Sequence, residues 1–383
     1  MAGRTTTTRT TSASCAPSAD SSVAPFTFEE LVQAYYDCRR AKRNTNSARE
    51  FEQHMEANLL ELYEQLQAGT YRPGRSICFV ITRPKPREVW AAQFRDRIVH
   101  HLLYNHVGAG IEATFIADSC ACIPGRGTLY AAERLEAKVR SVTQNWSRPC
   151  FYLKADLANF FVSIDKRVLA RQLRALIDEP WWRALALQVL WHDPREDYET
   201  RCPRWLFNQV PQHKRLTSQP AHLGLPIGNL SSQFFANIYL NALDQFAKHE
   251  LRAKHYIRYV DDFVLLHESP QQLNAWLAQI EGFLPGLGAK LNPTKTILQP
   301  VDRGIDFVGQ VIRPWRRTTR KRTVKEALRR VATSPDEDLL ATANSYFGLL
   351  GQATHSHADR AALANALLRR GKPVNAGLTQ TYR

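Results

Sequence analysis

The chain has 383 residues, of which 44% are hydrophobic, and its formal net charge is +15. No apolar run approaches the roughly 20 residues that a membrane-spanning helix needs, so the sequence excludes an integral helical membrane protein. The positive charge favours a polyanionic partner such as a nucleic acid. A membrane surface is the weaker alternative, because no amphipathic stretch with a large apolar face accompanies the charges.

The first 67 residues divide into a polar tail and a helical region. Residues 1–27 are rich in Thr and Ser and lack apolar periodicity, so we expect them to be disordered. They also lack the apolar core of a secretory signal. Residues 28–67 are predicted to be helical, because apolar side chains recur at every fourth position: Phe51, Met55, Leu59 and Tyr63.

Strands and helices are expected from there to residue 148, and one short hairpin at 83–89 is both basic and proline-stiffened. It carries Lys85 and Arg87 beside its prolines. Cations on a stiff hairpin can grip a triphosphate. Each cation alone is more often a solvated surface charge, so the prediction depends on the set.

The next informative feature is an acid at the end of a β-type run. Residues 151–155 are mostly apolar and lead into Asp156, and a helical pattern follows at 166–177. An acid at a strand end can form a divalent-metal site with acids from neighbouring strands. Taken alone, Asp156 is equally consistent with an acid at a helix N-terminus.

Two adjacent acids, Asp261 and Asp262, follow Tyr259 and Val260 at the tip of an apolar hairpin. Like charges this close repel each other and raise each other's pKa unless a cation neutralises them. A pair of Mg²⁺ ions would do so and would produce a phosphoryl-transfer site. The alternative, a solvated Asp-Asp turn, is about as frequent for the pair alone. The third acid, Asp156, favours the metal site.

With these three acids in place, the chain resembles a reverse transcriptase from about Phe28 to beyond Arg330. The resemblance implies an α+β right-hand polymerase: N-terminal helix and fingers at 28–148, a palm with an antiparallel sheet at 149–312, and a basic helical thumb at 313–383. It assigns Asp156 and Asp261 as the principal metal ligands, with Asp262 as the third acid. The implied metal-ligand set is Asp156, Leu157, Asp261 and Asp262.

The resemblance also implies how nucleotides are selected. Phe161 stands at the family's steric gate, where a bulky ring would collide with a ribose 2′-hydroxyl and favour deoxynucleotides. In the segment 224–233, glycine allows the backbone to approach a base pair or phosphate. Most reverse transcriptases have Gln and Pro where this chain has Ile227 and Gln233. Both residues are similar to those of diversity-generating retroelements, whose copying is error-prone at template adenines. We expect Ile227 to remove a polar contact near the nascent base pair; the alternative is that it merely packs.

Other expected substrate contacts follow from the same resemblance. Lys295 matches the lysine proposed to protonate the departing pyrophosphate, and a plain surface lysine is the alternative. Arg126 lies in a segment that resembles a fingers motif and is expected to contact template or triphosphate. The expected substrate-binding residues are, in all, Lys85, Arg87, Arg126, Phe161, Ile227, Gly228, Gln233 and Tyr259.

Two further segments stand out by composition. Residues 191–222 are polar and proline-rich and interrupt the palm as an insertion, either a surface lobe that docks a partner or a loop. Residues 313–330 hold nine Lys or Arg, and Trp315 among them offers a stacking surface. A helical stripe would follow a duplex backbone without reading its sequence: Lys321, Lys325 and Arg329. Helices are also predicted at 336–350 and 359–368.

The sequence therefore predicts a Mg²⁺-dependent RNA-directed DNA polymerase with two metal ions, for which Mn²⁺ could substitute. Its expected partners are an RNA template, a DNA or RNA primer, dNTPs, a small accessory protein and a dedicated structured RNA. The seven scattered cysteines fit reduced thiols in the cytoplasm. A diversity-generating retroelement is favoured; an antiviral-defence reverse transcriptase that uses a noncoding RNA is the first alternative. From another class, a catalytically inactive RNA-binding scaffold is disfavoured, because a scaffold needs neither the three acids nor Phe161.

Overall fold

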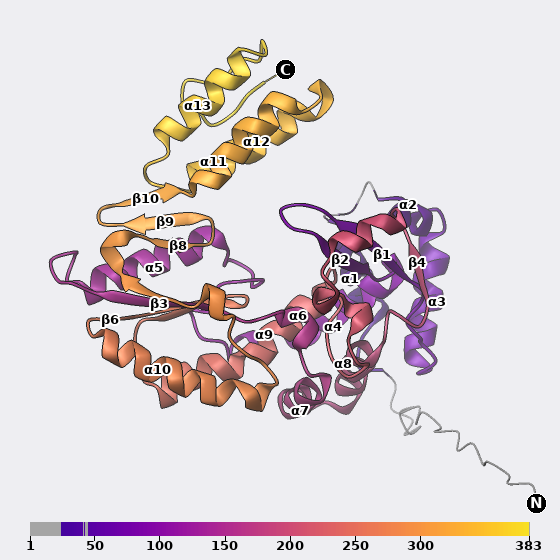
Figure 1. The fold of residues 1–383 in the computed structure, drawn as a ribbon. Coiled ribbons are helices and arrows are strands. Elements are labelled where there is room, and N and C mark those ends of the chain that lie inside the picture. The colour runs from indigo at the N-terminus through magenta and orange to yellow at the C-terminus, as the bar shows by residue number, and fades with distance from the viewer. Residues whose placement is uncertain (1–23, 41, 43–44, 383) are drawn as a thin grey trace, which may run out of the picture.

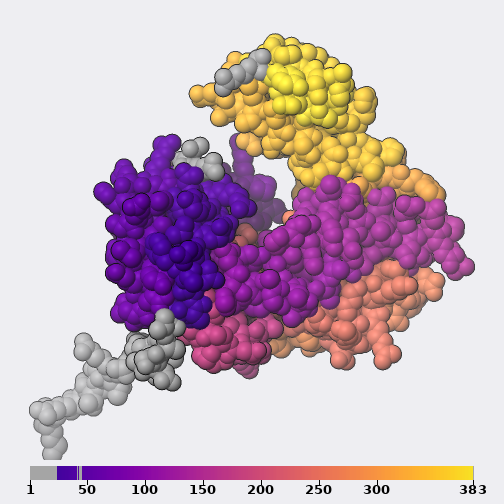
Figure 2. Space-filling view, turned by 180° about the vertical axis from the view of Figure 1, so that it is seen from behind, coloured from indigo at the N-terminus to yellow at the C-terminus, as the bar shows by residue number. Residues whose placement is uncertain are grey.

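The computed structural model describes residues 24–40, 42 and 45–382, so most of the tail expected to be disordered lies outside the described residues. The chain forms three lobes, with the N-terminal and C-terminal lobes on either side of a central sheet (Figure 1). The space-filling view, from behind, shows an open cleft between these two lobes (Figure 2). None of the helices in the described part of the chain is both long and apolar enough to cross a membrane.

The N-terminal lobe, the fingers, starts with helices that pack on α4. Three helices lie in the helical region expected at 28–67, because α1 ends at Arg39 and the helical backbone is interrupted again at His54. Phe26, which we assigned to the disordered tail, is buried, and its ring centroid lies 5.2 Å from that of Trp181. The helices are α1 (Phe28–Arg39), α2 (Asn46–Glu52), α3 (Met55–Gln67) and α4 (Phe94–Glu112).

A small sheet forms the rest of the fingers and recruits the proline-rich segment 191–222. β1 is the middle strand of this sheet and pairs antiparallel with β2 and parallel with β4. The buried Glu88 carboxylate accepts hydrogen bonds from the Leu216 N–H at 2.8 Å and the Thr217 hydroxyl at 3.2 Å. The segment expected as an insertion in the palm is therefore attached to the fingers sheet through β4, Leu216 and Thr217. The strands are β1 (Ser76–Ile81), β2 (Arg87–Ala91) and β4 (Tyr198–Thr200).

The central lobe, the palm, is a four-stranded antiparallel sheet in the order β5-β6-β3-β7. Successive side chains of a strand point to opposite faces, and both faces are covered here. Leu153 and Leu265 join the main core beneath α10, whereas Tyr152 and Leu266 join a second core beneath α5. The strands are β3 (Phe151–Asp156), β5 (Tyr256–Tyr259), β6 (Asp262–His267) and β7 (Ile297–Pro300). The helices are α5 (Thr128–Val142), α6 (Phe160–Ser163), α7 (Lys166–Leu176), α8 (Pro180–Trp191), α9 (Leu230–Gln245) and α10 (Pro270–Phe283).

The C-terminal lobe, the thumb, consists of helices with their own apolar core on a three-stranded sheet. β10 pairs with β9, so the first residues after 313 continue this sheet before the helices start. α12 and α13 coincide with the helices predicted at 336–350 and 359–368. α11 lies along the thumb's edge of the cleft (Figure 1). The elements are β8 (Ile305–Phe307), β9 (Gln310–Arg313), β10 (Arg316–Thr319), α11 (Lys321–Thr333), α12 (Asp336–Gly351) and α13 (His357–Leu368).

Candidate active site

The three acids that the sequence singles out lie at one corner of the palm sheet. β3 ends at Asp156 and β6 starts at Asp262, and the antiparallel register places these two residues directly opposite each other. The hairpin from β5 to β6 turns through Val260 and Asp261. The Asp261 carbonyl accepts a 3.2 Å hydrogen bond from the Leu157 N–H. Residues more than 100 positions apart in the chain thus bring three carboxylates together.

The local sequence explains why the acids stand at the tip of this hairpin. Ile257 and the run from Phe263 to Leu266 are fully buried, so the apolar parts of both strands pair inside the palm. The two acids between them therefore lie at the turn, Asp261 within it and Asp262 at the first position of β6. Val260 takes a positive φ of 54°, which is unusual for a β-branched residue. The turn is therefore tight and conformationally costly, and surrounding contacts must hold it.

Burial at this corner disfavours the ionised form of its carboxyl groups. Burial, followed by the negative charge of Asp156, raises the pKa of Asp261 to about 6. Burial also raises the pKa of Asp262, although the Lys154 ammonium, 3.5 Å from its carboxylate, opposes this shift. Lys295 Nζ lies 2.6 Å from Asp156 Oδ2. Two lysines therefore supply part of the positive charge that the corner attracts.

The donor chemistry of this corner fits a divalent cation such as Mg²⁺ or Mn²⁺, which prefer oxygen ligands. The raised pKa values of Asp261 and Asp262 reflect desolvation and repulsion that a bound cation would relieve. As the side chains lie, no three His, Cys, Asp or Glu groups within the described residues converge closely enough to hold an ion. The available ligands are the three carboxylates and the Leu157 carbonyl oxygen, since a leucine side chain offers no ligand atom.

Phe161, the expected steric gate, lies on the short helix α6 that follows the corner. Its carbonyl accepts a 2.8 Å hydrogen bond from the Leu225 N–H, and the Gly224 N–H donates to the Ile164 carbonyl at 2.8 Å. Gly224 has a φ of +90°, and a Cβ there would lie 2.6 Å from a methyl carbon of Leu216. The glycine is thus required for the segment 224–233 to lie against α6.

The same segment continues to the fingers sheet. The Ile227 carbonyl accepts a 2.8 Å hydrogen bond from the Trp90 N–H of β2, and the buried Asn229 amide donates to the Trp90 carbonyl at 3.1 Å. Gly228 between them is exposed, with a φ of +126°. Gln233 is exposed on the first turn of α9. The backbone around Ile227 therefore joins fingers to palm, while its half-buried side chain has no polar atom.

The expected cationic contacts are more dispersed. Lys85 and Arg87 are exposed at the tip of the β1–β2 hairpin. No hydrogen bond or ion pair within residues 24–40, 42 and 45–382 joins them to the three acids. Arg126 donates to the carbonyls of Ile116 and Ser119 at 2.8 and 2.7 Å, so its guanidinium is used to shape its own loop. Tyr259 is half-buried at the end of β5, next to the turn.

Two residues near the acids were missed by the sequence analysis. Lys154 lies two positions before Asp156 on the same strand, so both side chains share a face of the sheet, and that spacing was a usable signal. Arg258 directly precedes Tyr259 and is 1% exposed. A cation inside an otherwise apolar strand was the signal for Arg258, but its buried partner, Asp244, could not be identified from local sequence.

Comparison with known protein families identifies most of this region. Residues 84–312 match the family described as "Reverse transcriptase (RNA-dependent DNA polymerase)". No curated protein sequence matches the chain. Among solved structures, telomerase from Candida albicans, in complex with a TWJ fragment of telomeric RNA, is 15% identical, with a TM-score of 0.47 over 78% of this chain and 54% of that one.

Apo telomerase from Candida tropicalis, truncated from its C-terminal domain, is 12% identical, with a TM-score of 0.45 over 68% of this chain and 59% of that one. The chain thus spans between half and two thirds of the length of these two structures. The family match covers more than half of the chain and includes all three acids. The chain belongs to the reverse transcriptase family of RNA-directed DNA polymerases.

Proposed function

We propose that the chain copies a template RNA into cDNA at the acidic corner of the palm and that it serves a diversity-generating retroelement. The observation that carries the catalytic part is the register that sets Asp156 opposite Asp262 with Asp261 on the adjoining turn. These carboxylates would hold two divalent ions, Mg²⁺ or in its place Mn²⁺. When bound, such ions activate the primer 3′-hydroxyl and neutralise the triphosphate.

The side chains around the corner have separate roles in this proposal. The Lys295 ammonium, now paired with Asp156, would donate a hydrogen bond and then a proton to the departing pyrophosphate. The Phe161 ring would exclude a ribose 2′-hydroxyl. Lys85 and Arg87, on the exposed hairpin tip, would bind the triphosphate as the fingers approach it. Arg126 would act on the template by keeping its loop in shape.

Error-prone copying is supported by the residues at 227 and 233. The Ile227 carbonyl is already engaged by the Trp90 N–H, and its side chain offers a substrate no polar atom. A nascent base pair beside that side chain would lose the hydrogen bond that a glutamine could provide, and discrimination there would weaken. Gln233 is exposed on the first turn of α9, and it takes the place of the proline that most reverse transcriptases have there.

The proposal includes further partners. A small accessory protein and a dedicated structured RNA would deliver the template and prime synthesis, and the enzyme would act in the cytoplasm. The exposed cations of α11 would hold the template–primer duplex by its phosphates. This part of the proposal is supported by the positive charge of the chain and by the position of α11 beside the cleft (Figure 1).

Primer extension by the purified chain on an adenine-containing RNA, with Mg²⁺ and dNTPs, tests the proposal when the cDNA is sequenced. Substitutions concentrated opposite adenines support the retroelement function, and Ile227→Gln should reduce them. Faithful cDNA would keep the polymerase and favour antiviral defence instead. Asp261→Asn should abolish product, whereas Asp302→Asn, which removes an exposed acid elsewhere in the palm, should not. Equal synthesis by wild type and Asp261→Asn would overturn the catalytic assignment.

A further inference from the structure

Arg258, the residue two positions before Val260, is a cation buried inside the palm. Its side chain is 1% exposed, and its ion-pair partner on α9, Asp244, is 0% exposed. The pairing is bidentate: Nε donates to Asp244 Oδ1 at 2.7 Å and a terminal nitrogen to Oδ2 at 2.6 Å. Burial alone would lower the pKa of Arg258, but the charge and hydrogen bonds of Asp244 raise it above its ordinary value. The guanidinium is therefore permanently charged.

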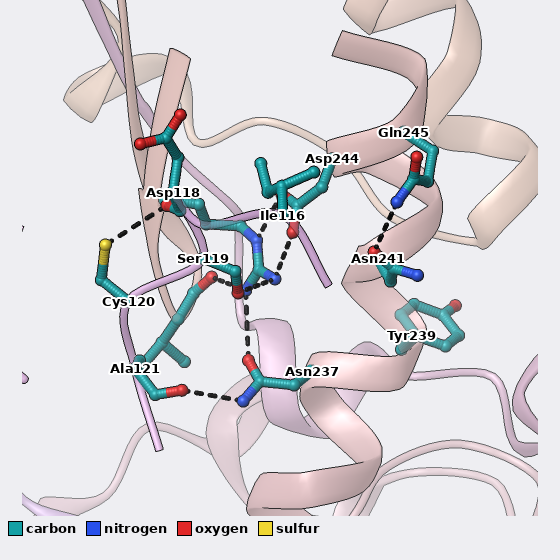
Figure 3. Close-up of polar contacts among 12 residues, drawn as sticks. Ile116, Asp118, Ser119, Cys120, Ala121, Asn237, Tyr239, Asn241, Asp244 and Gln245 are labelled. Atoms are coloured by element: carbon teal, nitrogen blue, oxygen red, sulfur yellow. Dashed lines mark hydrogen bonds and ion pairs between the residues drawn. The ribbon is translucent and has the colours of Figure 1, made fainter. Parts of the chain in front are cut away.

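The remaining donors of Arg258 reach two other segments. One terminal nitrogen donates to the Val260 carbonyl at 3.0 Å, inside the turn that carries the catalytic acids. The other donates to the Ser119 hydroxyl at 2.8 Å. Figure 3 shows Ser119 on its loop facing Asn237 and Asp244, which lie on different turns of α9. The guanidinium thus links α9, the loop around Ser119 and the acid-bearing turn.

The backbone reinforces the same connection. The Arg258 N–H donates to the Asp118 carbonyl at 2.9 Å, and the Arg258 carbonyl accepts from the Cys120 N–H at 3.0 Å. The Asn237 amide of α9 donates to the Ala121 carbonyl at 2.8 Å (Figure 3). The loop at 118–121 therefore forms a wall of the network, and Arg258 is its centre.

The turn needs such an anchor. Val260 has a φ of +54°, which is unfavourable for a β-branched side chain, and the acids that follow it repel each other. Without outside contacts, the turn would relax towards a less strained backbone and move its carboxylates apart. An ion pair that only staples α9 to β5 would need Asp244 and nothing more. The bond to the Val260 carbonyl is the part that reaches the catalytic turn.

We propose that Arg258 is a positioning residue that holds the Val260 carbonyl and thereby keeps the turn with Asp261 and Asp262 beside Asp156, where the three carboxylates can close on a metal ion. This inference rests on the polymerase function. It also predicts that α9 and the loop at 118–121 transmit their position to the acids, because Arg258 contacts both. A disturbance in either segment would loosen the metal-binding turn without touching the acids.

The test uses Arg258→Lys in the full-length chain. A lysine keeps the buried positive charge for Asp244, but its single ammonium cannot reach Asp244, Ser119 and Val260 together. Amide hydrogen exchange without metal should become faster in peptides covering residues 256–264. Mn²⁺ affinity, measured by electron paramagnetic resonance, should fall about tenfold or more, in the range found when residues behind metal ligands are changed. In primer extension, the half-maximal Mg²⁺ concentration should rise and excess Mg²⁺ should restore part of the rate.

Arg195→Lys is the matched control. Arg195 also makes a bidentate ion pair, with Asp193, and donates to the carbonyls of Leu216 and Gln219, so its contacts lie in the segment 191–222 and outside the network around the turn. This change should lower thermal stability but leave exchange at 256–264 and Mn²⁺ affinity unchanged. If Arg258→Lys behaves like Arg195→Lys, with reduced stability but wild-type exchange and Mn²⁺ affinity, the Arg258 ion pair only joins α9 to β5 and the proposal is overturned.

Ser119→Ala provides a second variant if Arg258→Lys does not fold. It removes one 2.8 Å contact of the guanidinium and leaves the pair with Asp244 intact. Exchange at 256–264 should then rise and Mn²⁺ affinity should fall, by less than for the lysine variant; wild-type values for both would overturn the proposal. Because exchange and Mn²⁺ binding do not need turnover, these results stand apart from the proposed function. The catalytic function is tested separately, by whether the wild-type chain makes cDNA and Asp261→Asn does not.

Discussion

Gly228 offers a prediction whose size can be worked out from the contacts around it. Its φ is +126°, and a Cβ there would lie 2.8 Å from Val89 Cγ1 and 3.3 Å from the Trp90 carbonyl oxygen. The backbone strain of an alanine at such a φ costs about 1–3 kcal/mol, and overpacking adds about 1–3 kcal/mol. Relief would require moving β2, whose Trp90 N–H bonds the Ile227 carbonyl at 2.8 Å. We therefore expect Gly228→Ala to lower the free energy of unfolding by about 2–6 kcal/mol.

Thermal unfolding followed by circular dichroism checks this value. A loss of this size should lower Tm by at least about 4 °C, given about 2–4 °C per kcal/mol for domains of 150–250 residues. Gly110→Ala is the matched control: it lies in α4, and a Cβ there meets nothing within 4 Å. This change should raise stability by about 0.5–1 kcal/mol. If Gly228→Ala melts with the wild type or with Gly110→Ala, the tight junction between fingers and palm is not as described. In primer extension, Gly228→Ala should also raise the KM for dNTPs.

Three further perturbations test other parts of the molecule. Phe161→Ala should raise the use of rNTPs relative to dNTPs by about tenfold or more, measured by single-nucleotide insertion. An unchanged ratio of rNTP to dNTP insertion would show that Phe161 is not a steric gate. Glu136→Gln weakens a 2.7 Å ion pair with Arg317, which is 6% exposed. It should lower the free energy of unfolding, measured with denaturant, by about 1.5–3 kcal/mol; an unshifted denaturation midpoint would show that the ion pair does not stabilise the fold. Replacing Lys321 and Lys325 by Ala should reduce the salt dependence of duplex binding by about two units in log K against log[salt]; an unchanged slope would place the duplex elsewhere.

The sequence predicted the parts of the site that depend on local pattern. An apolar run that ends in an acid predicts a strand with Asp156 at its end, and the apolar flanks of Asp261 and Asp262 predict a hairpin with both acids at its tip. The helices at 336–350 and 359–368 were predictable for the same reason, since apolar periodicity records which face of a helix is buried. The break between α2 and α3 was not, because Phe51 and the helix after it keep the same spacing across the turn.

Placement in space was beyond local pattern. The proline-rich segment 191–222 was expected on the palm, but β4 pairs with β1, more than 100 residues earlier in the chain. Proline and polar residues predict only that a segment is irregular, and its neighbours depend on which buried groups need partners. Here the buried Glu88 carboxylate has Leu216 and Thr217 as donors.

The sequence by itself was enough to identify the family and its reaction, because the motifs around the three carboxylates lie in the region that matches the reverse transcriptase family. Only the tertiary structure decided how the acids are held. Asp156 faces Asp262 through strand register, and Arg258 reaches Ser119, 139 residues away, at 2.8 Å. A buried cation needs an acidic partner, and which acid lies beside it depends on how distant segments pack together, which local sequence does not specify.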